Sequence, residues 1–306
     1  MNEITIFTPT FNRAYILKDA YNSLLSQSEK KFIWIIIDDG SSDGTNQLVS
    51  EWLLEGRLNI VYQWKPNGGM HTAHNVALDL IETELCFCLD SDDQLKPNAI
   101  EIILKHWKSL PNKESTAGIV MHENYITSGE RIGSAFPIGI TKATFKDLYY
   151  RYGVKGDKLL IYRAKLLKEN VYPVFNTENF VPLDYKYLLI DQPLSILEDS
   201  IYQKEYLTEG YSKNIVKIYA KNPVGFAFYH AFRMKKVDSL FTKIKSSIHL
   251  TACLLLSKQN QVFSRSPMKI LTLFTLPLGL LRFYQLIKEK KSLAFKNYDE
   301  NTTCDK

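Results

Sequence analysis

The chain has 306 residues, of which 45% are hydrophobic and 23% charged, and its formal net charge is +5. This length accommodates one sizeable domain with an appendage, or two small domains. The composition is that of an ordinary globular protein, and the net charge is too small to indicate a nucleic-acid partner.

The first predicted unit is a β-branched strand at residues 4–7, followed by a helical pattern at residues 16–25. Between them, Thr8 and Pro9 come at the carboxyl end of the strand, where the backbone can face a ligand. The alternative is a plain strand-to-helix turn with Asn12 as the helix cap.

The second predicted strand, residues 32–37, is strongly apolar and ends in Asp38 and Asp39, followed by small turn residues. This combination predicts an open pocket floor, where a carboxylate can accept a hydrogen bond from the N–H of a nucleobase such as uracil. Alternatively, Ser42 or Asp43 caps the following helix. Both interpretations can hold for different residues of the same loop.

The third predicted strand, residues 59–64, precedes Gly68 and Gly69 and then a helix over residues 71–81. Consecutive glycines before a helix N-terminus allow a ligand to approach the backbone closely, and the helix dipole favours an anion there. The segment is neither a phosphate-loop sequence nor the dinucleotide-binding fingerprint. We expect His71 and His74 to be capping or packing residues and assign them no metal.

The fourth predicted strand, residues 85–89, ends abruptly in Asp90, Ser91, Asp92 and Asp93. Because neighbouring carboxylates repel one another, this cluster indicates a positive partner. A divalent cation bound through one or two carboxylates and a substrate diphosphate would neutralise it. The alternative is a solvated acidic loop before the helix that begins near Pro97.

These four strand–loop–helix units occupy about 110 residues. The pattern predicts an α/β fold with a Rossmann-like, mostly parallel central sheet flanked by helices. Right-handed crossovers place all four loops along one edge of such a sheet. Three of the loops carry groups that can bind a ligand, so we expect one shared site at that edge.

The second half has further predicted strands at residues 117–121 and 159–162, and then a helical, basic C-terminal region. This region has many lysines and few acids, which favours binding to an anionic surface such as lipid headgroups. An apolar segment at residues 269–291 is interrupted by Pro277 and Gly279, and we expect it to be too short and too broken to span a bilayer. It either lies in the membrane interface or packs on the main domain.

The N-terminal residues lack the basic region and apolar core of a signal peptide, so none is expected. The cysteines, Cys86, Cys88, Cys253 and Cys304, show neither metal-ligand nor disulfide-framework spacing. They are expected to be small core residues in a reducing compartment. The predicted location is cytoplasmic, with peripheral attachment to the inner face of the plasma membrane left open.

Together, the loop motifs resemble those of the family 2 glycosyltransferases, whose nucleotide-sugar-binding α/β fold is called GT-A. The matching pieces are TPTFNR at 8–13, IDDGSSDGT at 37–45, NGG at 67–69 with AHN at 73–75, and LDSDD at 89–93. The resemblance implies a GT-A domain at residues 1–220, in which 1–110 form the nucleotide-binding half and 111–220 the acceptor half. Residues 221–306 would form a helical extension.

The resemblance implies that Thr8, Pro9 and Asp39 hold the nucleoside, with Asp39 facing the base. Asp90 would face the ribose or the start of the diphosphate, and Asp92 would ligate Mn²⁺ or Mg²⁺ bridging the diphosphate. The other motif positions expected in the nucleotide site are Thr10, Asn12, Arg13, Asp38, Asn67, Gly68, Gly69, Asn75 and Ser91.

In the family, a Glu-Asp pair after the metal motif lies near the acceptor, and one of its carboxylates is the general base. Here Glu178 is followed by Asn179, so the pair is broken. Glu178 is the first candidate for the base and Asp184 the second. In the structural alternative, Thr177 or Asn179 caps a helix, and Glu178 complements the dipole of that helix.

The predicted reaction is the inverting transfer of a sugar from a nucleotide-diphosphate donor, with UDP favoured, to a hydroxyl group of a saccharide or lipid-linked saccharide. The metal would stabilise the leaving diphosphate, and one carboxylate would take the proton of the acceptor hydroxyl. Residues 206–212 and Asn222 with Pro223 are similar to a subset of these enzymes that act in bacterial capsule, lipopolysaccharide or other surface-polysaccharide assembly. Peripheral contact with an anionic membrane is expected from the basic C-terminal region.

Two other functions stay open at this point, and the sequence does not specify the oligomeric state. A nucleotidyltransferase also uses an α/β fold and an acidic metal site, but it usually has a glycine-rich loop after the first strand. Residues 8–13 contain no glycine. A catalytically inactive module could keep the fold and either bind a nucleotide or anchor an assembly at the membrane.

Overall fold

A computed structural model describes residues 3–205, 214–259 and 261–303. The chain forms two compact units, of which the N-terminal unit comprises Met1–Tyr172 and Lys186–Glu205. The C-terminal unit comprises Pro173–Tyr185 and Tyr206–Lys306. The C-terminal unit therefore includes a short segment from the middle of the chain. The functional halves predicted within residues 1–220 stay predictions.

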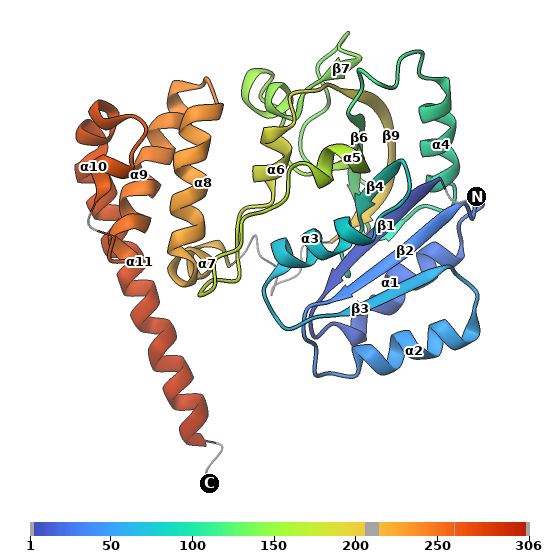
Figure 1. Cartoon of the computed structure of the whole chain (residues 1–306), viewed down its shortest axis with the longest axis horizontal. Coiled ribbons are helices and arrows are strands. Elements are labelled where there is room, and N and C mark those ends of the chain that lie inside the picture. Colours follow the sequence, from blue (N-terminus) through green and yellow to red (C-terminus); the bar gives the residue numbers. More distant parts are fainter. Residues whose placement is uncertain (1–2, 206–213, 260, 304–306) are drawn as a thin grey trace. The chain divides into compact units, whose positions relative to one another are not determined.

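The N-terminal unit is built on a nine-stranded sheet with the strand order β3-β2-β1-β4-β8-β6-β9-β5, in which β7 pairs with β9 (Figure 1). The strands of its parallel half are β1 (Ile4–Thr10), β2 (Phe32–Asp38), β3 (Ile60–Trp64) and β4 (Leu85–Cys88). The strands of its mixed half are β5 (Gln94–Leu95), β6 (Gly118–Tyr125), β7 (Lys142–Ala143), β8 (Lys158–Arg163) and β9 (Leu194–Lys204). The four predicted strands and their parallel arrangement are confirmed.

Helices cover both faces of this sheet. The helices on one face are α1 (Ala14–Leu25), α2 (Thr45–Glu55) and α4 (Ala99–Ser109). Those on the other face are α3 (Met70–Leu80), α5 (Ala164–Lys168) and the short π-helix η1 (Asp147–Arg151). Strands β1 and β2 are buried along almost their whole length because both of their faces are covered.

The parallel half brings the carboxyl ends of four strands to one edge. Thr10 at the end of β1 pairs in register with Asp38 at the end of β2, and Asp38 pairs with Trp64 at the end of β3. Strand β4 runs beside β1, with Phe7 opposite Cys88. The loops that follow these strands therefore leave the sheet next to one another, as expected for a doubly wound fold.

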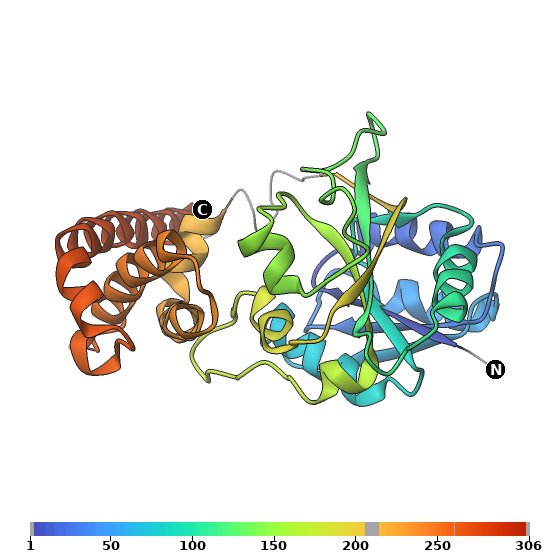
Figure 2. The same cartoon turned by 90° about the horizontal axis from the view of Figure 1, so that it is seen from above.

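The described helices of the C-terminal unit are α7 (Ile215–Lys221), α8 (Pro223–Lys236), α9 (Leu240–Leu256), α10 (Val262–Arg265) and α11 (Lys269–Thr303). In both views α8 and α11 lie beside α9 (Figures 1 and 2). Helix α6 (Asp184–Leu189) begins in the C-terminal unit and ends in the N-terminal unit. The surface-polysaccharide motif expected at residues 206–212 lies outside the described residues.

The structure corrects one expectation for the C-terminal region. Helix α11 passes through Pro277 without a break, although an interior proline removes one backbone N–H donor and its ring crowds the preceding turn. Among the described residues, the segment Lys269–Ser292, whose most apolar 18-residue window has a mean hydropathy of 1.6, is long and apolar enough to cross a membrane by length and composition alone. The expectation that this segment is too short and too broken was therefore wrong.

Candidate functional site

The predicted nucleotide-site residues gather at the carboxyl edge of the parallel strands. Asp38 ends β2, and the backbone N–H of Asp39 donates to the carbonyl oxygen of Thr10 at 2.8 Å. The backbone N–H of Leu89, just before Asp90, donates to the carbonyl oxygen of Phe7 at 3.0 Å. Backbone hydrogen bonds thus join the loops after β1, β2 and β4 where these loops leave their strands, as the sequence predicted.

The carboxylate of Asp39 is almost fully buried and joins the loop after β2 to the loop after β3. Its Oδ1 accepts hydrogen bonds from the backbone N–H of Gly68 at 3.0 Å and from the Lys65 ammonium. Its Oδ2 accepts the backbone N–H of Gly69 at 2.7 Å and the side-chain amide of Asn67 at 3.2 Å. These donors occupy the four lone-pair positions of the carboxylate.

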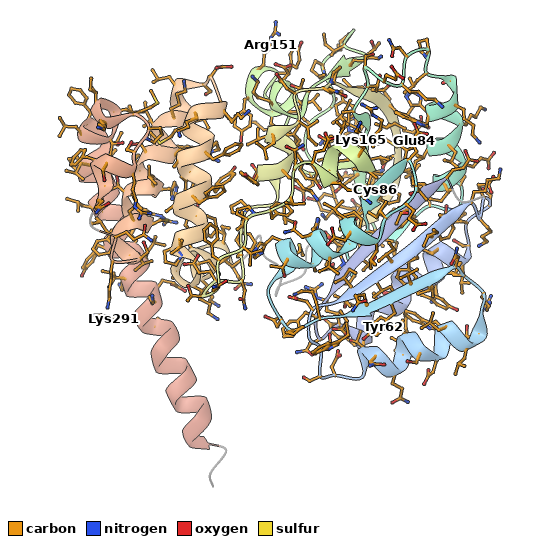
Figure 3. The ribbon with its side chains drawn as sticks, in the orientation of Figure 1. Tyr62, Glu84, Cys86, Arg151, Lys165 and Lys291 are labelled. Atoms are coloured by element: carbon orange, nitrogen blue, oxygen red, sulfur yellow. The ribbon has the colours of Figure 1, made fainter. Side chains whose placement is uncertain are left out.

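The predicted residues Asp38 and Asn12 hold the backbone of neighbouring loops. Asp38 accepts the backbone N–H of Ser41 at 2.7 Å and the hydroxyl of Tyr62, which is labelled in Figure 3, at 2.7 Å. Asn12 accepts the backbone N–H of Ser42 at 2.8 Å and donates its own backbone N–H to the Ser41 hydroxyl at 2.8 Å. The loops after β1 and β2 are therefore cross-linked, and both side chains act within the protein.

Two more predicted residues use side-chain polar groups in hydrogen bonds within the protein. The hydroxyl of Thr8 is buried and accepts the indole N–H of Trp34 at 2.8 Å. The amide of Asn75 donates to the carbonyl oxygen of Tyr172 and accepts the Tyr172 backbone N–H, both at 2.9 Å. These bonds give both side chains a role in holding the fold.

Predicted acidic residues at the end of β4 lie in different surroundings. Asp92 pairs with the Arg13 guanidinium, with 2.7 Å between Oδ2 and a terminal nitrogen, and both side chains are partly exposed. Asp93 is buried and accepts the hydroxyl of Tyr202 at 2.7 Å. Burial raises the pKa of both Asp90 and Asp93. Asp90 and Asp92 are the partly exposed members of this group, whereas Asp93 is buried.

A second cation, Lys204 at the end of β9, balances the buried carboxylates. Its Nζ lies 3.7 Å from Asp93 Oδ2, 3.7 Å from Glu123 Oε2 and 3.3 Å from Asp157 Oδ2. Burial opposes its charge, but these carboxylates and Asp90 outweigh that effect and raise the pKa of Lys204. Burial likewise raises the pKa of Glu123 to about 7.

Sequence reasoning missed Lys65, Glu123, Tyr202 and Lys204. Lys65 could have been predicted from the sequence, because it is the one cation between the end of β3 and the glycine pair. Tyr202 and Lys204 lie more than 100 positions after Asp93, and no local sequence pattern predicts that they pair with Asp93 across the sheet.

The site was tested for its fit to the expected divalent cation. Within residues 3–205, 214–259 and 261–303, no three His, Cys, Asp or Glu side chains come together in a way that could hold a metal ion by themselves. Mg²⁺ and similar ions commonly take only one or two carboxylates and complete their shell with substrate phosphates and water. The partly exposed carboxylate of Asp92 suits that arrangement, provided that a donor diphosphate supplies the other ligands.

The two histidines of α3 lie inside the protein, as expected for packing residues. His71 is buried, and neither of its ring nitrogens has a hydrogen-bond partner. Burial lowers the pKa of His71 to about 4, so the ring is neutral at physiological pH. His74 Nδ1 lies 3.0 Å from the buried ammonium of Lys186, whose pKa burial lowers to about 8.

The two candidates for the catalytic base belong to the C-terminal unit. The Glu178 carboxylate accepts the backbone N–H groups of Val224 and Gly225 at 2.7 Å each, at the start of α8. Asp184 accepts the hydroxyl of Tyr229. Burial raises the pKa of both carboxyl groups. The expected dipole-complementing role of Glu178 is therefore present, on α8 and not on the helix that follows it in sequence.

Comparison with known proteins gives a consistent result. The family model described as "Glycosyl transferase family 2" matches residues 5–171. TuaG of Bacillus subtilis, a glycosyltransferase named for teichuronic acid biosynthesis, is 32% identical over 99 residues. That match covers 32% of this chain and 39% of TuaG, so the chain matches well under half of that relative.

Solved structures extend the likeness over almost the whole chain. Residues 1–349 of S. aureus TarS, in complex with UDP-GlcNAc, match with a TM-score of 0.58 at 18% identity, over 96% of this chain and 92% of that one. PcManGT, a mannosyltransferase from Pyrobaculum calidifontis in complex with GDP-Man and Mn²⁺, matches with a TM-score of 0.55 at 13% identity, over 96% and 84%. These likenesses confirm the predicted GT-A fold.

The first prediction concerns the Asp39 junction. Asp39→Asn is expected to lower the free energy of unfolding by about 3–5 kcal/mol, because the amide replaces an acceptor with a donor and leaves the Lys65 charge unpaired. Denaturant unfolding followed by circular dichroism measures this change. The exposed residue Asp79 provides the matched control, Asp79→Asn. Equal stability of the two variants would contradict the structural role of Asp39.

The second prediction concerns pH. The pKa of Glu123 in the folded protein, about 7, lies above its ordinary value of 4.5. Its stabilising contribution is therefore fully present below pH 4.5 and is lost as the pH rises through 7. Glu123→Gln mimics the protonated form and is expected to be more stable than the parent by on the order of 2–3 kcal/mol at about pH 8.

The same comparison at about pH 4.5 should show no difference between Glu123→Gln and the parent. Unfolding midpoints across this pH range provide the measurement, and Glu82→Gln, at an exposed position, is the control. A Glu123→Gln variant that is less stable than the parent at both pH values would show that the charged form of Glu123 is the one the fold needs.

Proposed function

The chain belongs to glycosyl transferase family 2, and from this premise we propose that it transfers a sugar from a UDP-sugar to an acceptor hydroxyl with inversion at the anomeric carbon. The observation that carries the proposal is the meeting of Asp39, the glycine pair and Asp92 at one sheet edge within the matched region. A nucleoside, a diphosphate and a cation each have a chemically suitable partner there.

The nucleoside is proposed to lie over the loops that Asp39 joins. A uracil N–H would be accepted by Asp39, taking the place of one of its present donors, while Lys65 would keep its contact with the carboxylate. The neutral, unpartnered ring of His71 beside this junction offers a further contact for the donor. TarS, which shares the fold, is solved in complex with UDP-GlcNAc and with UDP, and this supports UDP as the nucleotide.

The diphosphate is proposed to lie between Gly69, at the start of α3, and Asp92. The N–H groups of Gly68 and Gly69 already donate to Asp39, so the contribution of the N-terminus of α3 to an anion is the positive end of the helix dipole. A Mn²⁺ or Mg²⁺ ion held by Asp92 would stabilise the charge that builds up on the leaving diphosphate. The pairing of Arg13 with Asp92 would place a second cation where the leaving group departs.

The acceptor hydroxyl needs a base, and Glu178 and Asp184 stay the proposed candidates. Both carboxyl groups have raised pKa values, which strengthens a carboxylate as a proton acceptor. Two backbone N–H groups already occupy Glu178, whereas Asp184 accepts one hydroxyl. The less occupied oxygens of Asp184 make it the more accessible of the two.

A catalytically inactive role is the second proposal, and one observation favours it. Asn179 stands where the family pattern has an acid, and the preceding Glu178 caps α8. A chain that binds UDP and metal but carries out no turnover would fit this arrangement. Nucleotidyl transfer receives no comparable support, because the likeness to glycosyltransferases includes the acidic motif itself.

The biological setting is proposed from relatives. TuaG is named for teichuronic acid biosynthesis, and we propose a related role for this chain in cell-surface polysaccharide assembly with a saccharide or lipid-linked saccharide acceptor. A cytoplasmic protein at the inner face of the plasma membrane would meet such an acceptor as well as its nucleotide-sugar donor.

The third prediction tests donor binding. UDP with Mn²⁺ is expected to raise the unfolding temperature, because a ligand that binds only the folded state stabilises it. Asp92→Ala should abolish the Mn²⁺-dependent part of that shift, while the exposed control Asp79→Ala should keep it. A full Mn²⁺-dependent shift in Asp92→Ala would contradict the metal assignment, and absence of any shift with UDP, GDP or ADP would contradict the function.

The fourth prediction separates the candidates for the base and tests turnover itself. A panel of UDP-sugars with Mn²⁺ is screened for transfer and for hydrolysis. Asp184→Asn or Glu178→Gln, whichever is the base, is expected to lower kcat by about 10²–10⁴-fold while keeping the UDP-dependent thermal shift. Asp191→Asn, at an exposed position, is the control.

Equal kcat in all three variants would place the base elsewhere. UDP binding without turnover by the parent on any donor would favour the inactive role.

A further inference from the structure

The first half of α11 has its polar side inward. Thr272 and Thr275 are buried against α9, where they meet Ser247, which is also buried. The large apolar side chains of the same turns point outward, and among them Ile270 is 75% exposed and Phe274 78% exposed. This is the reverse of the pattern of a helix on the surface of a water-soluble domain.

The inward side is a hydrogen-bonded seam of small residues. The Ser247 hydroxyl lies 3.0 Å from that of Thr272 and 2.8 Å from that of Thr275. Farther along, a Cβ added to Gly279 would come within 2.7 Å of the Thr251 side chain. The two helices therefore approach as closely as the missing side chain of glycine allows.

The spacing of these residues is regular on both helices. Ser247 and Thr251 are four positions apart on α9, and Thr275 and Gly279 are four positions apart on α11. Small residues at this spacing, combined with hydroxyl hydrogen bonds between helices, are typical of helix pairs in lipid, where burying large apolar side chains between helices brings no gain. Apolar side chains extend this contact, since Leu271, Phe283 and Leu286 of α11 pack in one cluster with Leu250 and Leu254 of α9.

The outward side forms a continuous apolar face on α11. Its exposed members are Ile270, Leu273, Phe274, Leu278, Leu280, Leu281 and Tyr284. On α9, Leu240 and Phe241 are also exposed, each at 65%. Singly exposed apolar residues need no explanation, but a contiguous row of this kind marks a surface that contacts something apolar.

The surroundings of this face are basic. Residues 258–292 contain seven Lys or Arg residues and a single acid, Glu289. Lys269 is exposed at the start of α11, and Lys288, Lys290 and Lys291 are exposed after the apolar face ends (Figure 3 labels Lys291). An apolar face with lysines at both ends matches a bilayer with anionic headgroups.

We propose that the face of α11 formed by residues 270–284 inserts into the hydrocarbon of an anionic lipid bilayer, with the helix lying in the plane of one leaflet. The apolar side chains lie on one side of the helix, while Thr272 and Thr275 on the other side are buried against α9, so only one side is open to lipid, as in a helix that lies in the interface. Lysines at both ends keep the helix ends at the headgroups. The inference does not depend on the proposed sugar transfer, since it uses only the C-terminal unit.

The experiment is vesicle flotation of the full chain. The parent is expected to float with vesicles of phosphatidylcholine and phosphatidylglycerol, and much less with phosphatidylcholine alone. The double variant F274D/L281D should lower the bound fraction at least about tenfold, because it places two carboxylates in the hydrocarbon. The matched control L54D/I138D makes the same change at exposed apolar positions of the N-terminal unit and should float like the parent.

Depth distinguishes insertion from a headgroup contact. In the variant F274W, lipids brominated on their acyl chains are expected to quench the added tryptophan fluorescence, with the parent protein as the background. Equal flotation of F274D/L281D and the parent, or no quenching of F274W, would overturn the proposal. A parent that ignores vesicles but dimerises through this face, with F274D/L281D monomeric, would also overturn it and assign the face to a second copy.

Discussion

The balance of charge at one edge of the sheet is the constraint on which the candidate site depends. Asp39 lies against Lys65, Asp92 against Arg13, and Asp93 with Glu123 against Lys204. Each carboxylate is thus placed beside a cation from a different loop or strand. Buried carboxylates without such partners would take up protons or unfold the edge. The cations therefore allow an acidic site to exist before any ligand arrives.

This arrangement divides the motif residues by task. Asp38, Asn12 and Asn75 hold loops in place through internal hydrogen bonds, while Asp92 keeps solvent access. A rigid frame around an accessible carboxylate is what a site for a diphosphate and a cation requires. Residues of one motif can therefore share a location without sharing a chemical role, and the structure assigns several of the motif positions to the frame.

The parallel half of the fold could be predicted because its signals are local. Strands β1, β2 and β4 are short apolar runs, each ending at a polar loop, and the helices after them show their own period. The pairing of Asp93 with Tyr202 and Lys204 could not be predicted, because sheet order in the mixed half decides it. The continuity of α11 was missed for a different reason: Pro277 and Gly279 are poor helix formers, but packing on α9 overrides that preference.

The route of the chain between the units affects how such a protein can be divided or recombined. Pro173–Tyr185 belongs to the helical unit although the sheet resumes after it, and its Glu178 needs the first turn of α8 as its hydrogen-bond partner. Deleting everything after residue 213 would strip this inner segment of the surface it packs on. A viable chimera must therefore exchange Pro173–Tyr185 together with the C-terminal helices.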